Sequence, residues 1–194
     1  PISYGKYSQI FDHPMTMGSG EWLCFEFPMS YWLEKEGYDV TYCSNSDMLS
    51  PQRGMKCKAF LSVGHDEYWD RRQYDSVVAM RDAGVNLMFL SGNSVCWVSP
   101  YRESFDGRQN RILFRGGPYG GSYTLAESRN LEHGPFPHRG PDEGYLIGAR
   151  NVDPVNGGGD WVCTSPDHWI YEGTGMKLGQ TDRKSTRLNS SHAN

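Results

Sequence analysis

The hydrophobic pattern of the chain is most regular in its middle, where two short apolar runs flank a segment of helical period. Residues 59–63 form an apolar run of strand length, and residues 85–90 form a second one. Between them, residues 70–83 repeat apolar side chains at the spacing of a helix face. Because the second run is mostly apolar, with Asn86 as its one polar residue, we predict a strand buried on both faces. The order strand, helix, strand predicts parallel strands joined by a right-handed crossover, which is the α/β class.

Upstream, a further helix is predicted from apolar residues at helical spacing: Trp22, Phe25, Met29, Trp32 and Leu33. Proline is best tolerated in a first helical turn, so we expect the helix to begin at Pro28 and to end before Gly37. Residues 38–43 predict a short strand, and residues 45–58 predict a polar connection to the first apolar run.

Beyond Pro100 the pattern changes, because clusters of glycine and proline separate short strand-like pieces. We predict that residues 100–160 form a loop-rich β insertion that folds over the edge of the sheet. The expected organisation is one domain over residues 1–181. The polar tail, residues 182–194, has no hydrophobic period and resembles a sequencing artefact, so we expect the sequence to be a fragment whose natural chain continues differently beyond Thr181.

Composition narrows the classes of function. The chain has 194 residues, a net charge of −4 and a pI near 5.9, and it lacks a stripe of lysine and arginine, which argues against nucleic-acid binding. No apolar run approaches the ~20 residues that span a membrane. Five scattered cysteines without a C-x-x-C pair are typical of thiols in a reducing compartment and favour the cytoplasm. The chain begins at Pro1 without a targeting segment from which a compartment could be read.

The candidate chemistry follows the first apolar run, in Gly64-His65-Asp66-Glu67-Tyr68. Ligands of a parallel α/β sheet bind at the carboxyl ends of its strands. Because side chains alternate along an extended chain, we expect His65 and Glu67 on one side, as a ligand pair or as a base with the carboxylate that orients it. The alternative is that Asp66 or Glu67 caps the following helix.

Asn93 ends the second predicted strand and is therefore expected beside His65 and Glu67. Its amide could hydrogen-bond a substrate carbonyl or hold a ligand carboxylate, or it could be an ordinary turn asparagine. Cys96 would be a nucleophile only if a base activated it, and its apolar neighbours favour burial.

The other polar candidates are predicted to be structural. His133, His138 and His168 lack metal-type spacing, and we expect His168 with Trp169 to pack under the insertion. Glu143 could reach the site, but a solvated turn is favoured.

Five strings of residues occur in order over roughly residues 8–181: Phe11-Asp-His-Pro14, Trp32-Leu-Glu-Lys-Glu-Gly-Tyr-Asp-Val40, Val63-Gly-His-Asp-Glu-Tyr-Trp69, Asp82-Ala-Gly-Val-Asn-Leu87 continuing through Asn93 and Trp97, and His168-Trp169 followed by Glu172-Gly-Thr-Gly-Met-Lys-Leu-Gly179. Together they resemble the catalytic large (beta) subunit of N,N-dimethylformamidase. Gly-His-Asp-Glu-Tyr-Trp is the most specific of these strings.

The resemblance implies a mostly parallel doubly wound sheet of the class I glutamine amidotransferase-like or flavodoxin-like type, without the nucleophilic cysteine of the amidotransferases. It also implies a mononuclear iron (Fe) bound by two tyrosines and a glutamate, a hard oxygen ligand set. The glutamate falls on Glu67, a histidine that supports it on His65, and an asparagine on Asn93. The tyrosine ligands lie earlier in the family, with Tyr4 and Tyr7 as the candidates here, and a further glutamate lies late in the domain. We therefore expect the metal site to be incomplete in this sequence.

The sequence by itself is consistent with three functions. The first is an iron-dependent hydrolase of small amide C–N bonds, in which the ion polarises the carbonyl or acidifies a water, His65 orients Glu67 or moves a proton, and Asn93 donates to the oxyanion. Its expected partners are a small amide substrate and either a small subunit or a second copy of the chain. The second is a non-catalytic amidotransferase-like carbohydrate-binding module, as in trehalose-utilisation-type relatives. The third is a cysteine hydrolase that uses Cys96.

Overall fold

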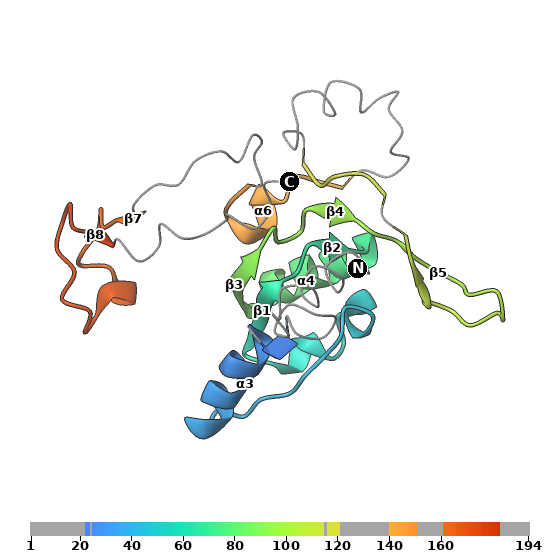
Figure 1. The fold of residues 1–194 in the computed structure, drawn as a ribbon, viewed down its shortest axis with the longest axis horizontal. Helices are drawn as coiled ribbons and strands as arrows, with labels where there is room; N and C mark the ends of the chain where they lie inside the picture. The colour runs from blue at the N-terminus through green and yellow to red at the C-terminus, as the bar shows by residue number, and fades with distance from the viewer. Residues whose placement is uncertain (1–21, 24, 115, 121–139, 151–160, 183–194) are drawn as a thin grey trace, which may run out of the picture. The chain divides into compact units, whose positions relative to one another are not determined.

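The structure is a computed structural model of the chain (Figure 1). It describes residues 22–23, 25–114, 116–120, 140–150 and 161–182. The chain divides into two compact units, residues 1–153 and residues 154–194, and each is described by itself.

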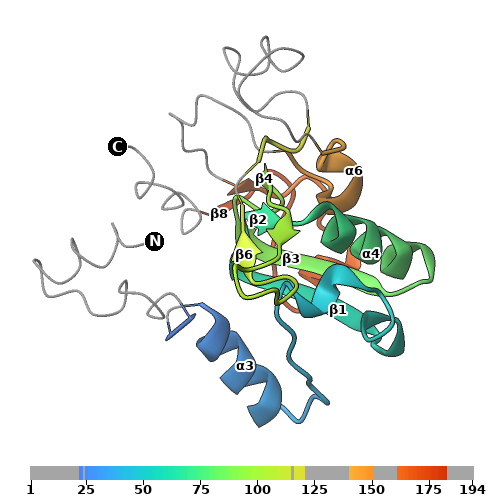
Figure 2. The ribbon, with the colours of Figure 1, turned by 90° about the vertical axis from the view of Figure 1, so that its right-hand side faces the viewer.

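A parallel strand pair with a crossover helix forms the centre of the first unit. β1 (Ala59–His65) and β3 (Asn86–Gly92) pair in register, from Ala59 opposite Asn86 to His65 opposite Gly92. α4 (Arg71–Asp82) connects them and lies along one side of the pair (Figure 1 and Figure 2). The predicted order of strand, helix and parallel strand is therefore confirmed. Each strand runs two residues beyond its predicted end, so His65 is the last residue of β1 rather than part of a turn.

The first unit also contains two short strand pairs. β2 (Tyr68–Trp69) pairs in parallel with β4 (Trp97–Val98). β5 (Tyr101–Arg102) pairs with β6 (Ile112–Leu113) in antiparallel fashion. The described part of the first unit thus combines helices with small parallel and antiparallel sheets, which is an α/β protein with short strands after Pro100.

The core of the first unit lies between α4 and the β1–β3 pair. Its buried side chains are Met48, Trp69, Tyr74, Val77, Met80, Val85, Val95, Val98, Tyr119 and Leu146. Leu87 and Phe89 of β3 pack against this core, whereas Met88 and Leu90 on the other face are 47% and 45% exposed. The predicted burial of this strand on both faces is wrong, because within the described residues only the face toward α4 is covered.

α3 (Glu26–Lys35) begins two residues before the predicted start and places Pro28 in its first turn, where a missing N–H breaks no helical bond. It ends before Gly37, as predicted. Gly37 has φ +81°, and its N–H donates to the Glu34 carbonyl at 3.1 Å. The Tyr38 N–H donates to the carbonyl five residues earlier at 3.0 Å, which completes a Schellman cap.

Gly37→Ala is expected to lower the free energy of unfolding by about 1–2 kcal/mol, because a Cβ is disfavoured in left-handed backbone. The added Cβ would have nothing within 4 Å. The loss of stability therefore comes from the unfavourable backbone conformation and not from a steric clash. Urea unfolding measures it. Gly37→Asn is the control and should be less destabilised, since asparagine tolerates positive φ. An alanine variant as stable as the wild type would contradict the left-handed cap.

Residues 38–43 form no strand, contrary to the prediction. Among the described residues no strand pairs with them, and most of their side chains are exposed. The connection that follows contains two single-turn 3-10 helices, Asp47–Leu49 and Gly54–Lys56, and the first of them buries Met48 in the core.

The helices are short. α6 (Gly144–Ile147) is a single turn, and α4, with 12 residues, is the longest helix in the described part of the chain. Within that part, no helix combines the length and the apolar character needed to cross a membrane.

The second unit contains β7 (Trp161–Val162), which pairs antiparallel with β8 (Thr181–Asp182), and a 3-10 helix over Trp169–Tyr171. The His168 side chain accepts a backbone N–H as the cap of that helix, and Trp169 is 75% exposed. The two residues form a local turn within the second unit, and their packing under the insertion stays a prediction.

Candidate functional site

The carboxyl ends of β1 and β3 bring three predicted site residues together. His65 ends β1 and stands opposite Gly92, the last residue of β3. Glu67 follows His65 by two residues, and Asn93 follows Gly92 directly. The parallel register therefore places all three at one edge of the strand pair, where ligands of such sheets bind.

His65 and Glu67 form a largely buried pair. The His65 Nε2 and Glu67 Oε2 atoms are 3.1 Å apart, and the two side chains are 21% and 13% exposed. An imidazole and a carboxylate at this distance share a hydrogen bond, so each fixes the orientation of the other. Both side chains lie on one side of the chain, as their spacing predicts.

The Glu67 carboxyl is held in its ionised form. Burial by itself raises its pKa, but the hydrogen bond and charge of His65, followed by hydrogen bonds from the side chains of Tyr68 and Asn93, bring the pKa below its usual range. An imidazole, a phenol and an amide thus converge on one carboxylate. Such a group can bind a cation or accept a hydrogen bond from a substrate at neutral pH.

Neither Asp66 nor Glu67 caps the following helix, so that alternative is wrong. α4 is capped by Asp70, whose carboxylate accepts the Arg72 backbone N–H at 2.8 Å. The chain forms β2 before the helix begins, which keeps both acids away from its first turn. The Asp66 carboxylate instead accepts a hydrogen bond from the Ser62 hydroxyl at 2.8 Å.

Asn93 is a turn residue and a neighbour of Glu67 at once. Its φ of +48° is the left-handed conformation that asparagine tolerates, so the turn role allowed by the sequence is present. Its side chain also hydrogen-bonds the Glu67 carboxylate. Val95 has φ +55°, an outlier for a β-branched residue, and its N–H donates to the Asp66 carbonyl at 3.1 Å. The turn is therefore strained and tied to the segment between β1 and β2 that carries Glu67.

Cys96 has a structural environment. It is 1% exposed, and its backbone N–H donates to the Glu67 carbonyl at 3.0 Å. A thiol without access to solvent cannot meet a substrate, so the predicted burial of Cys96 is confirmed and a cysteine hydrolase is not supported.

Glu143 is buried, contrary to the predicted solvated turn. It is 2% exposed at the cap of α6, and its carboxylate fills the space beside Gly120, where an added Cβ would collide with it. The sequence did not predict this burial, because the burial depends on the packing of two segments that are distant in the chain.

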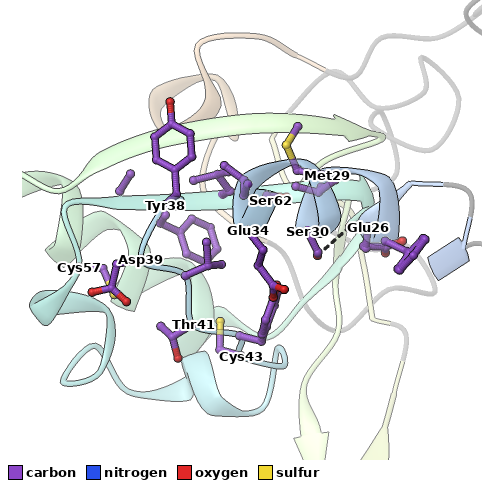
Figure 3. Close-up of a pocket in the computed structure, with 18 of the residues that line it drawn as sticks. Glu26, Met29, Ser30, Glu34, Tyr38, Asp39, Thr41, Cys43, Cys57 and Ser62 are labelled. Atoms are coloured by element: carbon purple, nitrogen blue, oxygen red, sulfur yellow. Dashed lines mark hydrogen bonds between the residues drawn. The ribbon is translucent and has the colours of Figure 1, made fainter. Parts of the chain in front are cut away.

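A cleft of about 1450 Å³ opens between α3, residues 37–43 and β1, and its lining includes His65 and Asp66. Glu34 on α3 and Thr41 and Cys43 on the following segment line it together (Figure 3). Of the three candidate site residues, the cleft reaches His65.

Glu26, at the other end of the lining, was not predicted as a site residue. Its carboxylate lies against Gly64, the residue before His65, because a Cβ on Gly64 would be 2.9 Å from Glu26 Oε1. Gly64 also has φ +89°, so its backbone conformation favours glycine there. No sequence signal points to Glu26, since its position depends on how α3 docks against the end of β1.

Of the metal ligands that the family resemblance implies, Glu67 lies within the described residues. In that part of the chain, no group of three or more His, Cys, Asp or Glu side chains is arranged to hold an ion. Several residues considered from the sequence lie outside the described residues: Tyr4, Tyr7, His133, His138 and the string from Phe11 to Pro14.

Fold and site together define an α/β protein with a histidine, carboxylate and amide cluster at its strand ends. A protein-family model described as "N,N-dimethylformamidase beta subunit-like, C-terminal" matches residues 3–189. The chain therefore belongs to this family, as its strings implied. Comparison with curated proteins and with solved structures gave no match.

Proposed function

We propose that the protein is an iron-dependent hydrolase of small amide C–N bonds, similar to N,N-dimethylformamidase. The observation that carries the proposal is the convergence of His65, Tyr68 and Asn93 on the ionised Glu67 at the strand ends. Membership of the family supports amide hydrolysis in general. The particular amide and the metal are parts of the proposal.

Each residue of the cluster has a chemical role in this proposal. The Asn93 amide donates to the substrate carbonyl oxygen as negative charge develops on it. His65 holds Glu67 in place and passes a proton to the departing amine, because an imidazole exchanges protons readily near neutral pH. Glu67 contributes the negative charge that a cation needs.

Iron is supported by the chemistry of Glu67 and by the resemblance to the family. A carboxylate kept ionised among hydrogen-bond donors is the hard oxygen ligand that suits Fe(III). Glu67 would hold the ion together with ligands from outside the described residues. When bound, such an ion supplies Lewis-acid polarisation of the carbonyl or acidification of a water molecule.

We also propose the wider architecture of the family, a doubly wound sheet of the amidotransferase-like type, supported by the parallel β1–α4–β3 unit. A small amide would reach His65 through the cleft. A small subunit is the partner we favour over a second copy of the chain, because the family is described as beta subunit-like.

The test is an amide-hydrolysis assay, with metal analysis, on the protein expressed from its complete gene. We expect release of dimethylamine from N,N-dimethylformamide, or of the amine from a related small amide, and stoichiometric iron. An iron-free protein that is inactive on a panel of small amides would overturn the proposal.

A carbohydrate-binding module is the second candidate, favoured by the exposed aromatic side chains of Tyr31, Tyr38 and Tyr42 along the cleft. Rings of this kind present an apolar face and a polar edge. Calorimetric titration with oligosaccharides separates the two candidates, since saturable sugar binding without amidase activity would favour the module.

Asn93→Gly is expected to lower kcat for amide hydrolysis about 100-fold, because the oxyanion donor is lost while glycine accepts the positive φ. Steady-state kinetics measure the effect, and KM should change less than kcat. Asn110→Gly is the matched control, since Asn110 also has a positive φ, of +56°, and lies near the β5–β6 pair. Full activity in Asn93→Gly would show that the donor role is wrong.

A further inference from the structure

Asp66 lies between His65 and Glu67 in the chain, but its side chain makes different contacts. Its carboxylate bonds to the side chain of Ser62, four residues earlier, whereas His65 and Glu67 bond to each other. The Ser62 hydroxyl donates to Asp66 Oδ2 at 2.8 Å. The Asp66 carboxylate thus binds back to β1, the strand that ends in His65.

The second oxygen of Asp66 binds a different part of the chain. Asn45 Nδ2 donates to Asp66 Oδ1 at 3.1 Å and to the Tyr68 carbonyl at 3.3 Å. Asp66 therefore orients the Asn45 amide, and that amide fixes the peptide that follows Tyr68. One carboxylate links β1, the connection after α3 and the start of β2.

The backbone around Glu67 is also tied to the second strand and the turn that follows it. The Asp66 N–H donates to Ser91 Oγ at 2.8 Å. The carbonyls of Asp66 and Glu67 accept three further N–H groups, at 2.9 to 3.1 Å, from Val95, Cys96 and Trp97. The backbone from the Asp66 N–H to the Tyr68 carbonyl is thus fixed at successive groups.

We propose that Asp66 is a positioning residue of the candidate site, which sets the backbone from which His65 and Glu67 project and does not touch the substrate. This inference rests on the proposed function of that site. The role requires hydrogen-bond geometry, because each Asp66 oxygen accepts one bond, from Ser62 or from Asn45. A displacement of about 1 Å at a reacting group costs about 10²-fold in rate. Loss of the Asp66 contacts should therefore act on kcat more than on KM.

The kinetic test compares Asp66→Ala with Asp66→Asn in the protein expressed from its complete gene. Asp66→Ala should lower kcat for a small amide about 10–100-fold, with KM changed less than about threefold. Asp66→Asn should stay within about threefold of the wild type, because its amide oxygen can accept from Asn45 and its amide nitrogen can donate to the Ser62 hydroxyl. Asp75→Ala is the control, the same change at an exposed carboxylate that pairs with Arg71, and it should leave kcat unchanged.

Amide hydrogen exchange gives a second readout that needs no enzymatic activity. Asp66→Ala should increase exchange in residues 65–68 and 95–97 and leave α4 protected, and Asp66→Asn should leave both regions as in the wild type. If the protein hydrolyses no amide, the proposed function fails, and exchange by itself decides whether Asp66 positions the backbone. If Asp66→Ala does not fold, Asn45→Ala removes one of the two side-chain bonds and should give the same changes at smaller size.

Three results would overturn the inference. Equal damage by Asp66→Asn and Asp66→Ala would mean that the charge of Asp66 matters and not its hydrogen-bond geometry. If Asp66→Ala lowers kcat but leaves hydrogen exchange unchanged, Asp66 has a direct chemical role. If Asp66→Ala changes neither kcat nor hydrogen exchange, Asp66 has no role in the site.

Discussion

Glu67→Gln is expected to lower kcat for amide hydrolysis by at least about 100-fold and to remove bound iron, while the fold persists. Glutamine keeps the shape of the side chain and can still hydrogen-bond His65, Tyr68 and Asn93. It lacks the negative charge that those neighbours maintain against the effect of burial. Steady-state kinetics on a small amide, with metal analysis of the same preparation, measure both effects.

Glu34→Gln is the matched control for this prediction. Glu34 lines the cleft that reaches His65, where it accepts a hydrogen bond from the Tyr42 hydroxyl, but it comes from α3 and not from the strand ends. We expect full activity and unchanged iron. Undiminished activity in Glu67→Gln would show that the ligand assignment is wrong.

Asp70→Ala is expected to lower the free energy of unfolding by about 2–4 kcal/mol, the largest change in stability that we predict. The Asp70 side chain is 4% exposed and accepts the N–H groups of Arg72 and Tyr101, each at 2.8 Å. Loss of a helix cap costs about 0.5–2 kcal/mol, and a buried N–H left without its acceptor costs about 1–3 kcal/mol. Urea unfolding measures the sum. Asp75→Ala, which breaks an exposed ion pair with Arg71, should cost about 1 kcal/mol or less, and equal losses in both variants would contradict the buried role of Asp70.

The same carboxylate gives the stability of the protein a defined pH dependence. Burial raises the pKa of Asp70, but hydrogen bonds from the Arg72 side chain and the Tyr101 N–H outweigh it, so the folded pKa lies below the unfolded value of about 3.9. A lowered folded pKa contributes stability that is present above the unfolded value and is lost as pH falls through the folded value. Tm measured from about pH 5 down to pH 2 should fall more steeply in the wild type than in Asp70→Asn. Parallel curves would show that Asp70 does not carry this dependence.

The sequence by itself determined the central unit and the pairing of His65 with Glu67, the main candidate site residues. The apolar runs and the helical period between them correspond to β1, α4 and β3, and Gly37 ends α3 as its position indicated. The two-residue spacing of His65 and Glu67 predicted their common side, and the order of the strands predicted Asn93 beside them. These features follow from local chain geometry, since the period of a helix or strand and the left-handed preference of glycine act over a few residues.

Only the tertiary structure decided which faces are covered and which polar groups meet. In the folded protein, one face of β3 is exposed and Glu143 is buried beside Gly120. Residues 38–43 have no strand partner among the described residues. The tertiary structure also placed the Asp66 carboxylate against Asn45. Each of these outcomes depends on the docking of segments that are distant in the chain, and an apolar or acidic residue carries no local signal of the partner that it will meet.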